Sequence, residues 1–221
     1  MFKKIIGVTH KIMQHPKYEE SLDCLDIRWS NLLTNLDFLT IPLATLDKKY
    51  VGDQLDKLQL DGIILSGGDT PNQNLNNMNK IKITKKNENI IFRDSYEVQL
   101  VLECIKRKIP IIGVCRGLQI LNIIFGGSLI KVSGHAIKGK HKIVSGEKSN
   151  FLDLSPKVNS YHNFGISKES LGKDLSPLAY DCEGNIEAFR HKKEKVLGIM
   201  WHPEREKNIQ KKDLMLFKNF F

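Results

Sequence analysis

The stretch "PIIGVCRGLQILN", residues 110–122, decides how the chain folds around its middle. A short β-branched run, Ile111–Val114, is typical of a buried strand, and a cysteine between two glycines follows it. Leu118 and Leu121 then recur at helical spacing, which continues through Ile124 and Phe125. The pattern predicts a strand, a sharp turn at Cys115 and a helix, which is the building unit of an α/β protein.

The turn has the form G-x-C-x-G, with Gly113 and Gly117 two residues to either side of Cys115. It is the thiol counterpart of the nucleophile elbow, in which the turn is so tight that side chains at the two glycine positions would collide. Such a turn holds the nucleophile at the carboxyl edge of the sheet, where open α/β folds bind ligands. The helix N-terminus and the charge of Arg116 are both expected to favour the thiolate. The competing interpretation is that Cys115 is a small apolar residue at the end of a buried strand.

Outside this stretch, strand and helix patterns alternate. Strands are predicted at 3–9, 38–44 and 62–66, and helices at 21–36, 50–60 and 93–108, the last with Asp94 as its N-cap and Glu97 completing a capping box. Residues 72–89 are polar and predict a surface excursion. The second half favours short strands at 127–132, 141–146, 185–189 and 195–200, closed by a helix at 211–221. We expect a mostly parallel central sheet with helices on both faces and added short strands in the C-terminal half.

Composition limits the class of protein. The 221 residues contain 41% hydrophobic residues, which suits one α/β domain spanning 1–221. The net charge of +9 suggests anionic partners, but the lysines are scattered, so nucleic acid is disfavoured. No apolar run is long enough to span a membrane or to form a signal peptide, and the four cysteines show no CxxC pair. These features predict a cytoplasmic protein with reduced thiols.

An activated cysteine needs a base, an orienting group and oxyanion donors. "VLGIMWHPERE" ends a predicted strand with His202 and Glu204, which point the same way in an extended segment, so Glu204 could orient the imidazole. The N–H of Arg116 and that of Gly67 or Gly68, in "SGGD", would face a developing oxyanion. Cys24 and Cys104 lack a glycine elbow, and we expect them to be structural.

Four motifs together carry a family resemblance: "GVCRGLQ", "GGSL" at 126–129, "VNSYHNFG" at 158–165 and "WHPE" at 201–204. In this order they resemble the class I glutamine amidotransferase-like superfamily, within it the branch of γ-glutamyl hydrolases and γ-glutamyl-γ-aminobutyrate hydrolases, which is peptidase C26-like. The likeness extends over almost the whole chain. It implies a flavodoxin-like α/β fold and no metal or organic cofactor.

The resemblance also implies roles for individual residues. Cys115 matches the nucleophile, His202 the base and Glu204 its partner, while Gly68 and Arg116 match the oxyanion donors. Residues expected to hold the γ-glutamyl group are Gly67, Arg93, Gln119, Ser160, Tyr161, His162 and Asn163.

The expected reaction is hydrolysis of a γ-glutamyl amide through a glutamyl thioester, which releases glutamate. The specific expectation is γ-glutamyl-CDP-amidate, cleaved to glutamate and cytidine diphosphoramidate in capsular polysaccharide modification; the lysines within 80–86 and 138–142 would then line a basic rim or form a solvated face. The alternatives are hydrolysis of another γ-glutamyl amine, a glutaminase subunit that delivers ammonia to a separate synthetase, and a non-catalytic flavodoxin-like binding protein.

Overall fold

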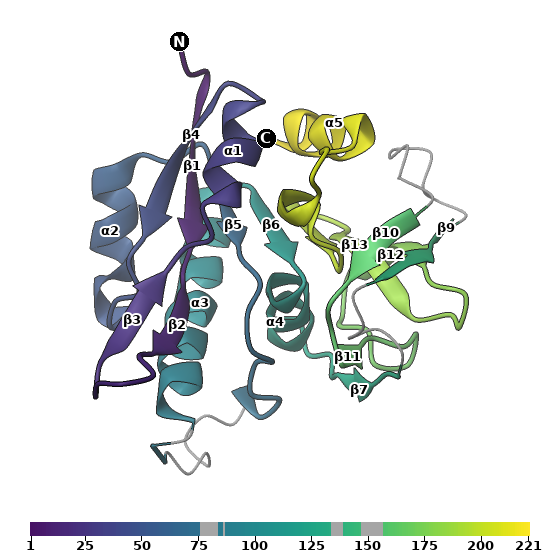
Figure 1. Ribbon diagram of the computed structural model, residues 1–221, viewed down its shortest axis with the longest axis horizontal. Coiled ribbons are helices and arrows are strands. Elements are labelled where there is room, and N and C mark those ends of the chain that lie inside the picture. The colour runs from purple at the N-terminus through teal and green to yellow at the C-terminus, as the bar shows by residue number, and fades with distance from the viewer. Residues whose placement is uncertain (76–83, 86, 134–138, 147–156) are drawn as a thin grey trace.

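The computed structural model describes residues 1–75, 84, 85, 87–133, 139–146 and 157–221 (Figure 1). Within these residues, eight strands form the central sheet. Across the sheet they are β4 (Phe38–Leu43), β1 (Lys4–Thr9), β5 (Gly62–Leu65), β6 (Ile111–Val114), β14 (Val196–Ile199), β13 (Ile186–His191), β12 (Leu175–Tyr180) and β9 (Val144–Ser145).

The first five strands across the sheet, β4 to β14, run parallel, and the last three pair antiparallel. Strands β5, β6 and β14 are buried along their whole length, as expected where helices cover both faces of a parallel sheet. The carboxyl ends of β1, β5, β6 and β14 therefore share one edge. This arrangement confirms the predicted α/β class and the mostly parallel sheet.

The helices are α1 (Arg28–Thr34), α2 (Val51–Leu58), α3 (Glu88–Arg107), α4 (Arg116–Ile124) and α5 (Lys211–Phe220), with 3-10 turns at Lys48–Tyr50 and Pro203–Arg205. The chain passes from β1 to β4 at the edge of the sheet, and the later connections, to β5, β6 and β14, run across the sheet in the opposite direction. Right-handed crossovers therefore put α1 on the face opposite α2, α3 and α4 (Figure 1). Helix α5 packs on α1, with the rings of Trp29 and Phe217 6.5 Å apart.

Smaller strand pairs flank the sheet. They are β2 (Lys11–Gln14) with β3 (Ser21–Cys24), β7 (Ile130–Lys131) with β11 (Phe164–Gly165), and β8 (Gly139–Lys142) with β10 (Lys157–Ser160). The pairs that contain β7 and β8, together with β9, β12 and β13, confirm that short strands gather in the C-terminal half. Strands β2, β3, β10, β11 and β12 were not predicted.

Two predicted helix starts are wrong. The helix expected at 21–36 begins only at Arg28, because Ser21–Cys24 pairs with β2 as a hairpin. The helix expected at 93–108 begins at Glu88, so Asp94 lies inside it and is no N-cap. Its carboxylate is fully buried and pairs with Arg116, which is a tertiary contact that local spacing does not reveal.

Much of the predicted surface excursion at 72–89 lies outside the described residues, as do parts of the two lysine-rich segments. Among the helices that the structure describes, none has the length and apolar character needed to cross a membrane. The extent of the domain, 1–221, stays a prediction.

Candidate active site

Cys115 occupies the tight turn between β6 and α4. Its backbone has φ 53° and ψ −103°, a positive φ that residues with a Cβ rarely adopt, and its N–H donates to the carbonyl of Ile199 on β14 at 2.8 Å. A Cβ at Gly113 would collide with the carbonyl of Gly117, and one at Gly117 would collide with the carbonyl of Leu65 on β5. The clash at Gly113 is the one expected from the sequence, within the turn itself, whereas Gly117 is required by the close approach of the neighbouring strand β5.

The Arg116 side chain does not act on the thiol in the way the sequence suggested. It is buried, and its guanidinium pairs with the carboxylates of Asp94 and Glu97 on α3. Burial alone would lower the pKa of Arg116, but these two carboxylates raise it. Because its charge is compensated there, only the backbone at the start of α4 is left of the two sources of positive potential expected from the sequence.

His202 and Glu204 form a buried pair directly after β14. His202 Nδ1 lies 2.6 Å from Glu204 Oε1, and the two residues are only 1% and 3% exposed. The extended segment expected here is wrong: Pro203 begins a 3-10 turn, and this turn places Glu204 beside the imidazole. Burial alone would lower the pKa of His202, but the sulfur of Cys115 and the carboxylate of Glu204 outweigh it and raise the pKa to about 9. The site therefore favours an imidazolium next to the cysteine at neutral pH.

Asn159 on β10 anchors the histidine and was not singled out from the sequence. Its Oδ1 accepts from the N–H of His202, and its Nδ2 donates to the carbonyl of His202, both at 2.8 Å. The same Nδ2 lies 2.8 Å from Glu206 Oε1. Asn159 belongs to the "VNSYHNFG" motif, one residue before the expected substrate loop, and that position is the only sequence signal of its role.

The loop after β5 carries Gly67 and Gly68 against the same histidine. A Cβ at Gly67 would lie 2.5 Å from His202 Cε1, so only glycine fits. Arg93 on α3 donates from Nη1 to the Gly67 carbonyl at 3.1 Å and from Nη2 to the Ser66 carbonyl at 2.9 Å. In a trans peptide the carbonyl and the next N–H point in opposite directions, so Arg93 turns the N–H of Gly68 away from itself.

Arg93 is part of a buried charge network. Its Nε donates to Glu97 Oε1 at 2.9 Å, an oxygen that also accepts from Thr9 at 2.9 Å. Two arginines, Arg93 and Arg116, thus face two carboxylates, and the cluster is neutral overall. A buried network of this kind holds its members in one geometry, because breaking any pair leaves an uncompensated charge.

The residues expected to hold substrate lie at different depths. Tyr161 packs edge-on against the His202 ring, with the ring centroids 5.6 Å apart. Gln119 Nε2 donates to the carbonyl of Phe164 at 2.9 Å, and His162 Nδ1 lies 3.0 Å from the same oxygen. Ser160 and His162 are buried, and Asn163 is exposed.

A cavity of about 520 Å³ joins most of these groups. Its lining includes Cys115, His202, Glu204, Gly67, Gly68 and Tyr161. Ser160, His162, Asn163 and Gln119 are not among the residues that line it. Cys24, expected to be structural, lines this cavity too, whereas Cys104 is buried in the core, where burial raises the pKa of its thiol to about 12.

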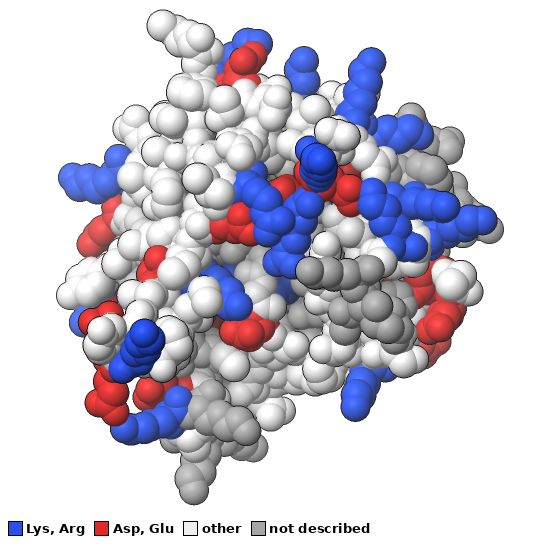
Figure 2. Space-filling model, in the orientation of Figure 1, with Lys and Arg blue, Asp and Glu red and all other residues white. Residues whose placement is uncertain are grey.

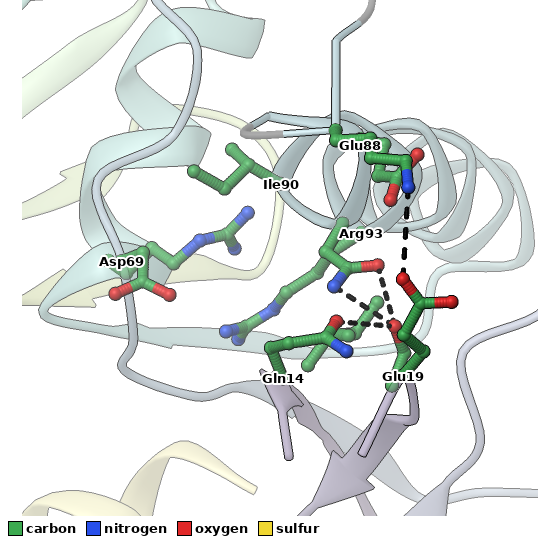
Figure 3. Close-up of a pocket in the computed structure, with 11 residues that line it drawn as sticks. Gln14, Glu19, Asp69, Glu88, Ile90 and Arg93 are labelled. Atoms are coloured by element: carbon green, nitrogen blue, oxygen red, sulfur yellow. Dashed lines mark hydrogen bonds and ion pairs between the residues drawn. The ribbon is translucent and has the colours of Figure 1, made fainter. Parts of the chain in front are cut away.

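A second cavity of about 700 Å³ adjoins the first, and Asp69 lines both. Figure 3 shows Gln14 and Glu19 from the β2–β3 region on one side of it and Glu88, Ile90 and Arg93 from α3 on another. Glu19 pairs with Lys85 across it at 3.9 Å. Its lining is thus polar and of mixed charge.

With the fold and the cavity established, comparison with protein families gives one decisive match. Residues 4–204, which include every candidate residue above, match the Peptidase C26 family. This protein belongs to the peptidase C26 family. Membership supports hydrolase activity and confirms the resemblance to glutamine amidotransferase-like proteins.

Individual relatives agree with the assignment to peptidase C26. Gamma-glutamyl-CDP-amidate hydrolase of Campylobacter jejuni subsp. jejuni serotype O:2 is 33% identical over 98% of this chain and 96% of that protein. Anthranilate synthase component 2 of Cyanophora paradoxa is 31% identical over 83% of this chain and 88% of that protein. A glutamine amidotransferase of Thermotoga maritima superposes with a TM-score of 0.61, covering 97% of this chain and 82% of its own, at 15% identity. That last likeness shows the fold alone.

Proposed function

We propose that this peptidase C26 protein is a cysteine-dependent γ-glutamyl amide hydrolase, with Cys115, His202 and Glu204 as its catalytic triad. The observation that carries the proposal is that Cys115, at a positive-φ elbow, shares one cavity with the buried His202–Glu204 pair. Similarity over nearly the whole chain to a gamma-glutamyl-CDP-amidate hydrolase supports the substrate class.

In the first half of the reaction, the thiolate of Cys115 attacks the γ-carbonyl carbon of the substrate. The carbonyl π electrons move to oxygen, and the oxyanion accepts from the N–H groups of Arg116 and Gly68. Each such donor contributes roughly 3 kcal/mol to catalysis in comparable enzymes. The C–N bond then breaks, the imidazolium of His202 gives its proton to the leaving nitrogen, and a glutamyl thioester remains on Cys115.

In the second half, His202, now neutral, takes a proton from water as the water oxygen attacks the thioester carbonyl. The C–S bond breaks, glutamate leaves, and the thiolate and the imidazolium are restored. Glu204 keeps the imidazole in the required orientation and stabilises its charge throughout. The mechanism draws on no metal or organic cofactor.

The γ-glutamyl group is assigned to the side of the site that holds Gln119 and residues 160–163. Gln119 Nε2 donates to the carbonyl of Phe164, so Gln119 would hold the segment that follows residues 160–163 from outside the cavity lining. Gly67 and Arg93 contribute by shaping and holding the loop that carries Gly68.

The finer proposal is that the leaving group is a cytidine diphosphoramidate. Its support is the relative that aligns with 98% of this chain, the gamma-glutamyl-CDP-amidate hydrolase. A role of the product in capsular polysaccharide modification is part of the same proposal. Loss of phosphoramidate from the capsule on deletion of the gene would be its test in cells.

A second candidate is a glutaminase subunit that supplies ammonia to a separate synthetase. Similarity to anthranilate synthase component 2 favours it. This candidate predicts slow hydrolysis of glutamine by the protein alone and stimulation when a partner synthetase is added, whereas a dedicated hydrolase needs no partner.

The test is glutamate release from glutamine, neutral γ-glutamyl amines and γ-glutamyl-CDP-amidate, compared by kcat/KM. We expect the nucleotide substrate to be preferred, Cys115→Ala to abolish turnover, and mass spectrometry of quenched wild-type protein to show a glutamyl adduct on the Cys115 peptide. Equally poor hydrolysis of all these substrates would favour the second candidate, a glutaminase subunit that needs a partner synthetase. A Cys115 no more reactive than the exposed Cys182 toward a glutamine-like alkylating agent would favour a non-catalytic protein.

A further inference from the structure

Strand β2 separates the active-site cavity from its neighbour. Lys11 and Met13 line the active-site cavity, whereas Ile12 and Gln14 line the second one. This alternation follows from the geometry of a strand, in which successive side chains point to opposite faces. The strand therefore delivers a lysine to the cavity that holds Cys115.

Of the three acidic groups that line the active-site cavity, Asp26 and Glu204 are compensated by ion pairs, whereas Asp69 has no ion pair among the described residues. Asp26 is held by Arg28 through contacts of 3.0, 3.1 and 2.5 Å, and Glu204 is held by His202. Asp69, where the two cavities meet, raises the pKa of Arg116 through its charge.

Two cations in the lining have donor groups that no acidic side chain among the described residues binds. Lys11 is half-buried and makes no ion pair or hydrogen bond through its side chain within the described part of the chain. The guanidinium of Arg205 lies 4.8 Å from the centre of the Tyr161 ring, and its Nε is 3.5 Å from Glu204 Oε1. Stacking on the ring holds the guanidinium in place while its terminal nitrogens are left without a partner among the residues described.

We propose that Lys11 and Arg205 bind the phosphoryl oxygens of the leaving group and so select γ-glutamyl amides whose leaving group is a diphosphate. This inference rests on the proposed function and deepens it. Two cations match the two negative charges of a diphosphate, and a planar guanidinium and an ammonium are the side chains that proteins use for phosphate. Figure 2 shows lysine and arginine side chains gathered around the middle of the face, with acidic side chains between them.

The other cations near the site fit this role less well. In the second cavity, Lys85 pairs with Glu19, and Arg93 and Arg116 pair with the buried carboxylates of Asp94 and Glu97. Of the lysine-rich segment at 138–142, Lys140 pairs with Glu206 at 2.6 Å. The other lysines of the expected basic rim lie in part outside the described residues, so the inference rests on two residues that no charge run marks.

The experiment compares γ-glutamyl-CDP-amidate with a neutral γ-glutamyl anilide for wild type, Lys11→Met, Arg205→Gln and the control Lys85→Met. The ratio of kcat/KM for the nucleotide over that for the anilide is expected to fall about 10- to 100-fold in the first two variants, the effect of losing one hydrogen bond to a charged group. It is expected to stay unchanged in Lys85→Met. Raising the salt concentration should lower the same ratio in wild type, because partly exposed charges are screened.

A second readout needs no turnover: binding of CDP to the same four proteins by calorimetry. We expect weaker binding in Lys11→Met and Arg205→Gln alone. Equal loss on both substrates, unchanged CDP affinity in these variants, or a loss in Lys85→Met would overturn the inference and leave the hydrolase proposal intact. If the wild type hydrolysed neither substrate while CDP binding was still weakened only in Lys11→Met and Arg205→Gln, the hydrolase proposal would be refuted and the phosphate site retained.

Discussion

The side chain of Asn159 binds both backbone polar groups of His202, accepting from its N–H and donating to its carbonyl at 2.8 Å each. One residue of β10 thereby sets the position of a histidine that follows β14, although β10 lies outside the central sheet. The backbone of His202 is held by Asn159 and its ring by Glu204, so the imidazole has little freedom to turn away from Cys115.

Asn159→Asp tests this anchor. Aspartate can still accept from the His202 N–H but cannot donate to its carbonyl, and it places a second carboxylate beside Glu206. A buried carbonyl without a donor costs about 1–3 kcal/mol, so we expect kcat to fall about tenfold and the melting temperature to drop by several degrees. Steady-state kinetics and thermal unfolding measure the two effects. The control Glu206→Gln removes a charge beside the anchor but keeps the anchor, and an equal kcat loss there would argue against positioning by Asn159.

The pH dependence of hydrolysis reports the His202–Glu204 pair. The pKa of His202 is raised from 6.5 to about 9, so the imidazolium persists at neutral pH and is lost as the pH rises through 9. We expect kcat/KM to decline above that pH, because the leaving nitrogen then has no proton donor. Glu204→Gln removes one of the charges that raise the pKa and should move this decline to lower pH, whereas Glu206→Gln should not. A decline that stays in place in Glu204→Gln would contradict the pairing.

The same shift predicts a change in stability. Since the folded pKa of His202 lies above its unfolded value, the stabilisation is complete below pH 6.5 and disappears as the pH rises through 9. Denaturant unfolding from pH 6 to 10 should show wild type losing stability over this window, and His202→Gln should lose less. Parallel curves for the two proteins would show that His202 carries no such linkage.

Arg93 is expected to act on catalysis through the Gly67–Gly68 peptide. Arg93→Met removes the donors that orient this peptide, and we expect kcat to fall about 10- to 100-fold with a smaller change in KM, approaching the loss of one oxyanion donor. The matched control is Arg107→Met, an arginine of the same helix that pairs with Asp56 at the surface. If Arg93→Met raised KM alone, a direct contact with substrate would be the better explanation.

Gly117, the second glycine of the elbow, is predicted to tolerate no side chain. In Gly117→Ala the new methyl group meets the carbonyl of Leu65, which is backbone and cannot rotate away. We expect the free energy of unfolding to fall by about 1–3 kcal/mol and hydrolysis to drop strongly. Gly52→Ala, in the first turn of α2, is the control, because its methyl group has only an ordinary contact of 3.5 Å with Arg107 and should stabilise the helix. A folded and fully active Gly117→Ala protein would be incompatible with this elbow.

The sequence alone determined the features in which a short segment decides its own shape. The strand, elbow and helix at 111–124 follow from an apolar run, two obligatory glycines and helical spacing, and His202 and Glu204 lie close together because only Pro203 separates them. The alternation of strands and helices was enough to predict a parallel sheet, since a parallel pair requires a crossover.

Only the tertiary structure decided which groups the charged and polar side chains bind. Asp94 has the spacing of a helix cap but is buried against Arg116, and Arg116 sits beside the thiol in sequence yet turns to α3. Lys11 and Arg205, almost 200 residues apart in sequence, meet at one cavity because a hairpin after β1 and a turn after β14 reach the same edge of the sheet. An unpaired buried charge is energetically costly, so each buried charge pairs with a group that the fold places within reach. The local sequence does not show which group that is.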